Sequence, residues 1–339
     1  GIMLTLVLGH CSYVWVENPM RRQLENKRFF HSAGILATTT SLLVALPAFA
    51  VWQQQGVAGR FSPAVELASA ESENRNPRRD ECHPSKGLDI PSCVFGGSQW
   101  KVIAAGDSHA SALVSAIVAA QKNGDAGVVQ WTYSGCAFVH GSKTISLGGS
   151  DYKCNEFIAW MEARLLTVPA DIPIVIISRY AGAALGGNET KLLVDKPSVY
   201  FSKIHTHSTP EFLAEFAQHI TQGACELAKE RTVYMVRPIP EMGFDVPRTL
   251  SRRLALGVIE DLSIPIEAYE KRNAWVWAAQ DAARDQCGIK ILDPTPYLCH
   301  DGRCYGSKNG RPLYHDDDHL SEFGNKLLVP MFAEIFKAL

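Results

Sequence analysis

The stretch WKVIAAGDSHASALVSAI, residues 100–117, places a sharp turn between a predicted strand and a predicted helix. The apolar run VIAA (102–105) stops at GDSH (106–109), and an alanine-rich helical pattern follows. One interpretation is a tight turn in which Asp107 caps the helix. The other is a nucleophile: the turn would push the Ser108 hydroxyl out of the sheet edge, where backbone N–H groups at the helix start can hold a developing oxyanion. Taken alone, this stretch favours the capped turn.

Short apolar runs alternate with amphipathic segments after residue 100. Predicted strands cover 101–105, 127–132, 172–178, 231–236 and 289–292, and predicted helices cover 108–122, 154–167, 210–230, 265–286 and 320–338. The strands lack a two-residue alternation, which is typical of a parallel sheet covered on both faces. We therefore predict an α/β fold, a three-layer α/β/α domain with a five-stranded, mostly parallel sheet. Chemistry in such sheets lies at the carboxyl ends of the strands, where Ser108 is placed.

A second polar turn precedes the last predicted helix, in GRPLYHDDDHLSEFGNKLLVP, residues 310–330. Asp316 and His319 are three residues apart, so on a turn their side chains can face each other. A carboxylate there would fix the tautomer of the imidazole and stabilise its protonated form, which is the role of the acid in a Ser-His-Asp triad. The alternative is a solvated acidic turn in which an aspartate caps the helix.

The charge balance and the remaining motifs exclude several classes of function. The net charge is −2 and no basic stripe is visible, so no nucleic acid partner is expected. Phosphate-binding loops are absent from the sequence. His205 and His207 have no third ligand nearby in the sequence, and no Cys-x-x-Cys occurs. We therefore expect no metal site and no cofactor bound by this domain.

Aromatic residues at the ends of predicted strands are a further candidate feature. Trp131, Tyr133 and Tyr180 occupy such positions. They either stack on the face of a bound sugar or pack in the core.

Two apolar segments near the N-terminus predict attachment to a membrane. Residues 29–52 contain no Asp, Glu, Lys or Arg, and at ~1.5 Å per residue this length crosses a bilayer, so we predict a transmembrane helix over 29–54. An earlier apolar run, Ile2 to Val16, is interpreted as the end of a preceding membrane helix in a larger protein. The loop between them carries cations, which place it in the cytoplasm and the residues after about 54 in the bacterial periplasm: Arg21, Arg22, Lys27 and Arg28.

Cysteine usage independently indicates an oxidising compartment. The chain has nine cysteines, of which Cys11 lies in the first apolar run. The other eight are an even number, which in an exported domain suggests disulfides. Pairing of nearest neighbours gives 82–93, 136–154 and 299–304 and leaves 225–287, although the sequence allows other connectivities.

Residues 55–99 read as a periplasmic linker or extension, because they are rich in Gln, Gly, Ser, Pro, Asn and charged residues and bury little. Cys82 and Cys93 would staple the second half of this segment.

The turns GDSH (106–109) and DDDHLS (316–321) together resemble the first and last motifs of the SGNH hydrolase superfamily. The strands predicted between them fit its flavodoxin-like fold, and the resemblance spans about residues 100–339. It implies that Ser108 is the nucleophile, His319 the general base and Asp316 its partner. Asp107 would brace the turn.

The same resemblance implies an oxyanion hole made by Ser108 and by Gly135 in YSGCAF (133–138). The third motif of the superfamily, Gly-x-Asn-Asp, is absent, and its place is taken by SRYAGAALGG (178–187). Arg179-Tyr180 stand where the oxyanion asparagine belongs, and Asn188 is the nearest asparagine. The hole is therefore either incomplete or completed by Arg179.

A narrower resemblance covers nearly the whole chain. The segments GCAF (135–138), RPIPEMGFDVP (237–247) and LCHDGRCY (298–305), in this order between the two turns, look like the periplasmic SGNH domain fused to acyltransferase 3 membrane proteins. SYVWVENPMRR (12–22) resembles the end of the acyltransferase 3 membrane domain, which would assign residues 1–28 to that end and the loop after it. Residues 29–54 and 55–99 then correspond to an extra membrane helix and a linker, and residues 100–339 to the SGNH domain.

This family resemblance implies O-acyl transfer, usually acetyl transfer, to a hydroxyl of a cell-envelope glycan such as O-antigen, exopolysaccharide or peptidoglycan. The acyl group would come ultimately from acetyl-CoA through the acyltransferase 3 domain in the inner membrane, and Ser108 would carry it. Two alternatives stay open. Water instead of a sugar would make the domain a carbohydrate esterase, and loss of the third motif would leave a non-catalytic glycan-binding domain.

Overall fold

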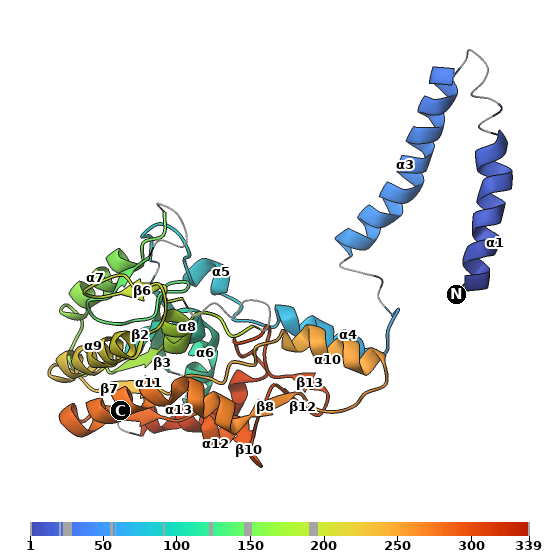
Figure 1. The fold of residues 1–339 in the computed structure, drawn as a ribbon. Coiled ribbons are helices and arrows are strands. Elements are labelled where there is room, and N and C mark those ends of the chain that lie inside the picture. The colour runs from blue at the N-terminus through green and yellow to red at the C-terminus, as the bar shows by residue number, and fades with distance from the viewer. Residues whose placement is uncertain are drawn as a thin grey trace. The chain divides into compact units, whose positions relative to one another are not determined.

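The computed structural model describes residues 2–19, 22, 29–54, 57, 59–90, 92–121, 125–145, 151–189 and 196–337. The chain divides into two compact units, Gly1–Phe61 and Ser62–Leu339 (Figure 1).

The first unit is helical. It contains α1 (Ile2–Ser12), a π-helical turn (Tyr13–Glu17) and α3 (Phe29–Gln53). The helix predicted over 29–54 is thus formed, but within the described residues no helix combines the length and apolarity of a membrane span. Of the four cations predicted to face the cytoplasm, Arg21, Lys27 and Arg28 lie outside the described residues.

The second unit is built on a six-stranded sheet in the order β1-β3-β2-β5-β7-β9. All five predicted strands are present and parallel, as β2 (Gln99–Gly106), β3 (Ala126–Thr132), β5 (Ile174–Ile177), β7 (Val233–Val236) and β9 (Lys290–Leu292). Their order is that of a doubly wound, flavodoxin-like sheet. The sixth strand, β1 (Cys93–Gly96), pairs antiparallel with β3 at one edge and was not predicted.

Helices cover both faces of this sheet, so the predicted three-layer α/β fold is confirmed (Figure 1). Alternate residues of β2 pack in two cores on opposite faces of the sheet. Ile103 and Ala105 lie in the first core, and Val102 and Ala104 lie in the second. The first core is closed mainly by α7 (Cys154–Leu165), α8 (Tyr180–Leu185), α9 (Pro210–Ala228) and α11 (Ile266–Cys287). The second is closed mainly by α6 (Ser108–Ala119), α10 (Val246–Ala255) and α13 (Val329–Phe336).

Short elements complete the second unit. The helical ones are α4 (Pro63–Ala70), a 3-10 turn (Glu71–Glu73), α5 (Arg79–Cys82), α12 (Thr295–Leu298) and a second 3-10 turn (Asn325–Leu328). The strands form three small antiparallel sheets: β10 (Cys299–His300) with β11 (Arg303–Tyr305) and β8 (Ser263–Pro265), β12 (Ser307–Lys308) with β13 (Arg311–Pro312), and β4 (Lys143–Thr144) with β6 (Val199–Tyr200).

The segment predicted to be a linker is largely part of the folded domain, which begins near Ser62 and not at residue 100. Val65 and Ala68 of α4 are buried, and α4 packs against α10. The buried Asn76 amide donates to the carbonyl of Ser111 at 2.8 Å and to Gln130 Oε1 at 3.2 Å. A few buried residues therefore hold this polar segment on the domain.

The last helix starts later than predicted. Leu320 forms an isolated bridge with Tyr314, and Ser321 Oγ accepts the Gly324 N–H at 3.1 Å, so residues 320–324 form a turn before the 3-10 segment and α13. All four predicted disulfides are present: Cys82–Cys93, Cys136–Cys154, Cys225–Cys287 and Cys299–Cys304.

Candidate active site

The turn between β2 and α6 is fixed by its glycine and its aspartate. Gly106 has φ +147, and a Cβ on it would lie 1.8 Å from the carbonyl oxygen of Ile177, so only glycine lets β2 end this close to β5. Asp107 is the N-cap of α6, and its Oδ1 accepts the His109 N–H at 2.9 Å. Its Oδ2 accepts the Arg179 N–H at 2.6 Å. The predicted bracing by Asp107 is confirmed, and it reaches the end of β5 as well.

Ser108, His319 and Asp316 meet at the carboxyl end of the sheet. Ser108 Oγ lies 2.6 Å from His319 Nε2, and His319 Nδ1 lies 2.8 Å from Asp316 Oδ2. Both contacts have hydrogen-bonding geometry, and they use opposite nitrogens of one imidazole. A hydroxyl, a base and an acid in this order can activate the hydroxyl as a nucleophile.

The loop carrying Asp316 and His319 is held by main-chain hydrogen bonds. Asp316 Oδ1 accepts the N–H groups of Asp318 at 3.0 Å and of His319 at 2.8 Å, which leaves Oδ2 for the imidazole. The loop carbonyls of Asp316 and Asp317 accept the N–H groups of Val246 at 3.1 Å and Met242 at 2.8 Å. These hydrogen bonds attach the loop that carries His319 to the rest of the folded domain.

A second carboxylate touches the same imidazole nitrogen, and the sequence did not reveal it. Asp318 Oδ1 lies 2.6 Å from His319 Nδ1, and the Asp318 side chain is only 3% exposed. Its other oxygen lies 2.5 Å from an Arg179 guanidinium nitrogen and 3.8 Å from His109 Nε2. His319 thus sits between a hydrogen-bonded carboxylate, Asp316, and an ion-paired one, Asp318.

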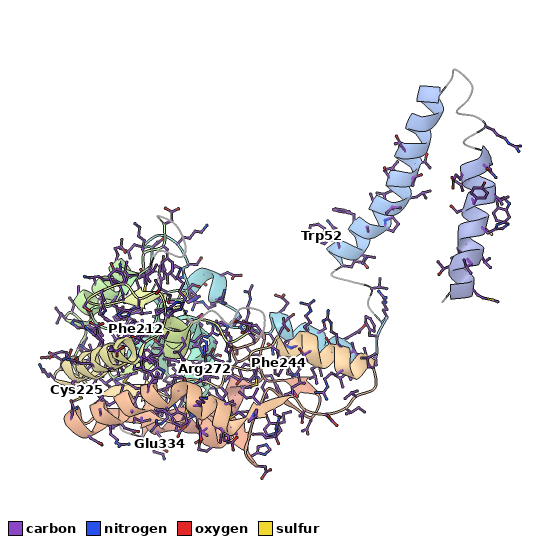
Figure 2. All side chains as sticks on the ribbon, in the orientation of Figure 1. Trp52, Phe212, Cys225, Phe244, Arg272 and Glu334 are labelled. Carbon is purple, nitrogen blue, oxygen red and sulfur yellow. A yellow bond between two sulfur atoms is a disulfide. The ribbon has the colours of Figure 1, made fainter. Side chains whose placement is uncertain are left out.

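The Arg179 side chain points into this acidic cluster. Besides Asp318, its guanidinium contacts Glu241 at 2.6 Å and Glu189 at 3.7 Å. Glu241 is in turn bound by both Nε and an Nη of Arg272 on α11, a residue labelled in Figure 2. The guanidinium predicted as a substitute oxyanion donor is thus already engaged with carboxylates on both of its terminal nitrogens.

The other candidate oxyanion donors are backbone groups. Ser108 is the first residue of α6, so its N–H belongs to the first-turn amides that lack an intrahelical acceptor. Gly135 has φ +65 in the turn after β3, and this turn is tied to the end of β2 because the Tyr133 N–H donates to the Gly106 carbonyl at 3.1 Å. The Asn188 amide donates to the Glu241 carbonyl at 3.2 Å.

The electrostatics of the cluster favour a protonated His319. Burial lowers the pKa of His319, but the attraction of Asp318 and of the hydrogen-bonded Asp316, whose oxygens lie 2.6 and 2.8 Å from Nδ1, outweighs it and raises the pKa to about 10. Burial raises the pKa of both carboxyls, yet the same interactions with His319 bring the pKa of Asp316 below its usual value and that of Asp318 well below. The three groups therefore form a charged unit at neutral pH.

Three further histidines surround the triad. The His109 ring lies 4.7 Å from the His319 ring and the His315 ring 5.3 Å, measured between centroids. Burial, with repulsion from His319 and Arg79, lowers the pKa of His315 to about 4. Burial, then repulsion from Arg79 and His319, lowers the pKa of His83 to about 3. His315 and His83 are thus neutral at pH 7.

The acid–imidazole clusters bring possible metal ligands together, but their atoms are already used. Ligand atoms of His109, Asp318 and His319 lie within 4.8 Å of one another, as do those of His315, Asp316 and His319. His319 Nε2 faces Ser108, and Nδ1 faces the two carboxylates. We therefore assign no metal to this cluster.

The aromatic candidates do not face a sugar. Trp131, Tyr133 and Tyr180 are at most 1% exposed and pack in the core beside α7 and α9. His205 is buried against Phe212, at 5.0 Å between ring centroids, and no metal-ligand cluster containing it is found in the described part of the chain.

Comparisons with known proteins identify a family and a similar fold. A family model described as the SGNH domain fused to AT3 domains matches residues 80–334. The periplasmic domain of a lipopolysaccharide acetyltransferase from Salmonella ser. Paratyphi A is similar in fold, with a TM-score of 0.54 and 14% identity over 81% of this chain and 97% of that one. Est24, a carbohydrate acetylesterase from Sinorhizobium meliloti, matches with a TM-score of 0.39 and 14% identity; the match covers 71% of this chain and 99% of Est24. No curated protein sequence is significantly similar.

Proposed function

The chain belongs to the SGNH domain family whose members are fused to acyltransferase 3 domains, and we propose that it transfers an acyl group, most simply acetyl, to a hydroxyl of a bacterial cell-envelope glycan. The observation that carries the proposal is the continuous contact from Ser108 Oγ through His319 to Asp316, at 2.6 and 2.8 Å. Such a chain activates a serine for acyl transfer.

In the first half-reaction, Ser108 Oγ attacks the carbonyl carbon of the acyl donor while neutral His319 takes the hydroxyl proton at Nε2. The negative charge on the carbonyl oxygen is held by backbone N–H groups, for which Ser108 and Gly135 are our candidates. The tetrahedral intermediate then collapses, the bond to the donor breaks, and the leaving group receives the proton from His319. The product is an ester on Ser108.

In the second half-reaction a glycan hydroxyl attacks the ester carbon and gives its proton to His319. Collapse breaks the bond to Ser108 Oγ, which takes the proton back, and the acylated glycan leaves. Water attacking the same ester would yield free acetate and an esterase. The triad supports both outcomes, so the fusion of this family to acyltransferase 3 domains is what favours transfer here.

The setting of the reaction is part of the proposal. Four disulfides and a periplasmic structural relative indicate an extracytoplasmic domain. Large apolar side chains along α3 offer a surface to a bilayer or a membrane domain, among them Leu43 at 71% exposure and Trp52, labelled in Figure 2, at 73%. We propose that an acyltransferase 3 domain in the inner membrane delivers acyl groups derived from acetyl-CoA, and that lipopolysaccharide O-antigen or a similar glycan is the acceptor.

The discriminating experiment gives the full chain an activated acetyl ester, with and without purified cell-envelope glycans. Acetate released and acetyl groups on glycan are both quantified. Transfer predicts acetylated glycan and a fall in free acetate as acceptor is added. Free acetate at a constant rate, whatever glycan is present, would instead identify an esterase.

The matched control is Ser108→Ala, which removes one oxygen atom. Both products should be lost in this variant. If turnover persists in it, Ser108 does not carry the acyl group and both enzymatic proposals fail. Glycan binding without turnover in the wild type would favour the non-catalytic module.

A further inference from the structure

The acid side of the triad contains one carboxylate more than a Ser-His-Asp arrangement needs. Asp316 alone satisfies the hydrogen-bonding geometry at His319 Nδ1, at 2.8 Å. Yet Asp318, immediately before the histidine, brings a second oxygen to 2.6 Å from the same atom. A buried carboxylate in such a position repels its neighbour Asp316 and needs a partner of opposite charge.

That partner is the residue that departs from the superfamily pattern. Arg179 follows β5 and stands where an oxyanion asparagine is expected, and its guanidinium lies 2.5 Å from Asp318 Oδ2. Its backbone is fixed by Asp107, and its other terminal nitrogen by Glu241 at 2.6 Å. The arginine therefore links the nucleophile turn, the acid loop and the Glu241–Arg272 pair.

We infer that Asp318 and Arg179 form a positioning pair for His319. Arg179 fixes the Asp318 carboxylate, and that carboxylate together with Asp316 holds Nδ1 of the imidazole so that Nε2 faces Ser108. The inference rests on the proposed role of His319 as the base. Neither residue of the pair is assigned a contact with substrate.

The pair also sets the pH above which His319 is neutral and can act as a base. The Asp318 carboxylate stabilises the His319 imidazolium. The positive charge of Arg179, paired with the same carboxylate, reduces this stabilisation. Other charged or titratable groups around the imidazole are Asp316, Asp317 and His315 on its own loop, His109 on α6, and Arg79 and His83 at and after α5. A change in the pKa of His319 on substitution of Asp318 or Arg179, with these other groups unchanged, would therefore be caused by the pair.

Removing each member should move the titration of His319 in opposite directions. Asp318→Asn keeps the shape but removes the attraction, so the imidazolium loses its proton at a lower pH, by about one unit or more. In Arg179→Gln the Asp318 carboxylate interacts with the imidazolium without a competing guanidinium, so the pH midpoint of the His319 titration rises. In the double variant the effect of Arg179→Gln should be much smaller, because the charge on which it acts is gone.

The experiment is a pH titration of the full chain with selectively labelled histidines, followed by NMR, for the wild type, both single variants and the double variant. Assignment of the His319 signal uses His319→Gln. The matched control is Asp317→Asn, which removes the third carboxyl of the same loop; Asp317 interacts with Asp316 and Asp318 but makes no described contact with His319, so this variant should move the midpoint much less than Asp318→Asn does. The pH profile of kcat/KM with an activated acetyl ester is measured in parallel, and its acid limb should follow the NMR midpoints.

Opposite shifts in the two single variants, with the control close to wild type, support the inference. A merely structural role would lower activity without moving the midpoints, and shifts in the same direction, or none beyond the control, would overturn the inference. Arg179→Lys keeps the charge and should restore the wild-type midpoint, which guards against a misfolded Arg179→Gln. The NMR titration needs no turnover, so an inactive wild type would refute the proposed function and leave this test intact.

Discussion

Asp316→Asn tests how the acid sets the tautomer of His319. In the native loop Asp316 Oδ1 accepts two backbone N–H groups, at 3.0 and 2.8 Å, and Oδ2 accepts from His319 Nδ1 at 2.8 Å. The oxygen of an asparagine would keep the two backbone bonds, since its amide nitrogen cannot accept them. Its NH₂ group would then donate to Nδ1. Because Nδ1 has to accept this hydrogen bond, a neutral imidazole would carry its proton on Nε2. In that tautomer Nε2 cannot take the proton of Ser108.

The magnitude depends on the second carboxylate. A fully wrong tautomer costs about 10⁴-fold in the serine protease in which this change is best known. Here Asp318 Oδ1 remains 2.6 Å from Nδ1 and still favours a proton there. We therefore expect kcat/KM to fall by roughly 10³-fold, or ~4 kcal/mol at ~1.36 kcal/mol per factor of ten. Asp316→Asn/Asp318→Asn should fall at least ~10-fold further.

The assay is kcat/KM for an activated acetyl ester at several pH values, with circular dichroism and thermal unfolding to establish that each variant is folded. Asp317→Asn is the matched control on the same loop and should stay near wild type. A folded Asp316→Asn with wild-type activity would refute the role of Asp316. A double variant no worse than the single one would show that Asp318 does not compensate.

Four further predictions concern the nucleophile, the base and the turn. Ser108→Ala should abolish turnover but change the free energy of unfolding by less than ~1 kcal/mol, because only the contact with His319 is lost, and a collapsed melting temperature would contradict this. Because the pKa of His319 rises from 6.5 to about 10 on folding, kcat/KM for acylation should increase with pH from 7 toward 10, and a flat profile would argue against a neutral His319 base. The same shift stabilises the fold fully below pH 6.5, and this stabilisation, on the order of 5 kcal/mol, is lost as the pH rises toward 10, so in urea unfolding the wild type should lose its advantage over His319→Gln in that window. Gly106→Ala should cost at least ~2 kcal/mol and all activity, since its Cβ would lie 1.8 Å from the Ile177 oxygen, and a stable, active variant in urea unfolding would disprove this close approach.

The parts of the site that local sequence defines could be predicted. A strand ending at Gly106-Asp107-Ser108 and a three-residue spacing from Asp316 to His319 are short-range features, and the parallel order of the strands follows from unpatterned apolar runs. The disulfide pairs were also within reach, because three of the four join neighbouring cysteines along the chain.

What depended on distant contacts could not be predicted. Three consecutive aspartates look alike in the sequence, and only the folded structure shows that Asp318 lies between Arg179, from the end of β5, and His319. The polar composition of residues 62–99 hid the few buried contacts, such as Asn76 with Ser111, that bind this segment to the domain. The sequence around Trp131 and Tyr180 does not show that helices from elsewhere in the chain bury them, so stacking on a sugar could not be excluded for them from the sequence.

The central claim, that Ser108 carries the acyl group, is tested most directly by mass spectrometry of the full chain after brief exposure to an activated acetyl donor. The account predicts one acetyl adduct on the peptide that contains Ser108, accumulating in the absence of acceptor and discharged when glycan is added. Ser108→Ala should show no such adduct. A wild-type protein that turns over the donor with Ser108 unmodified throughout, or an equal adduct in Ser108→Ala, would contradict the account.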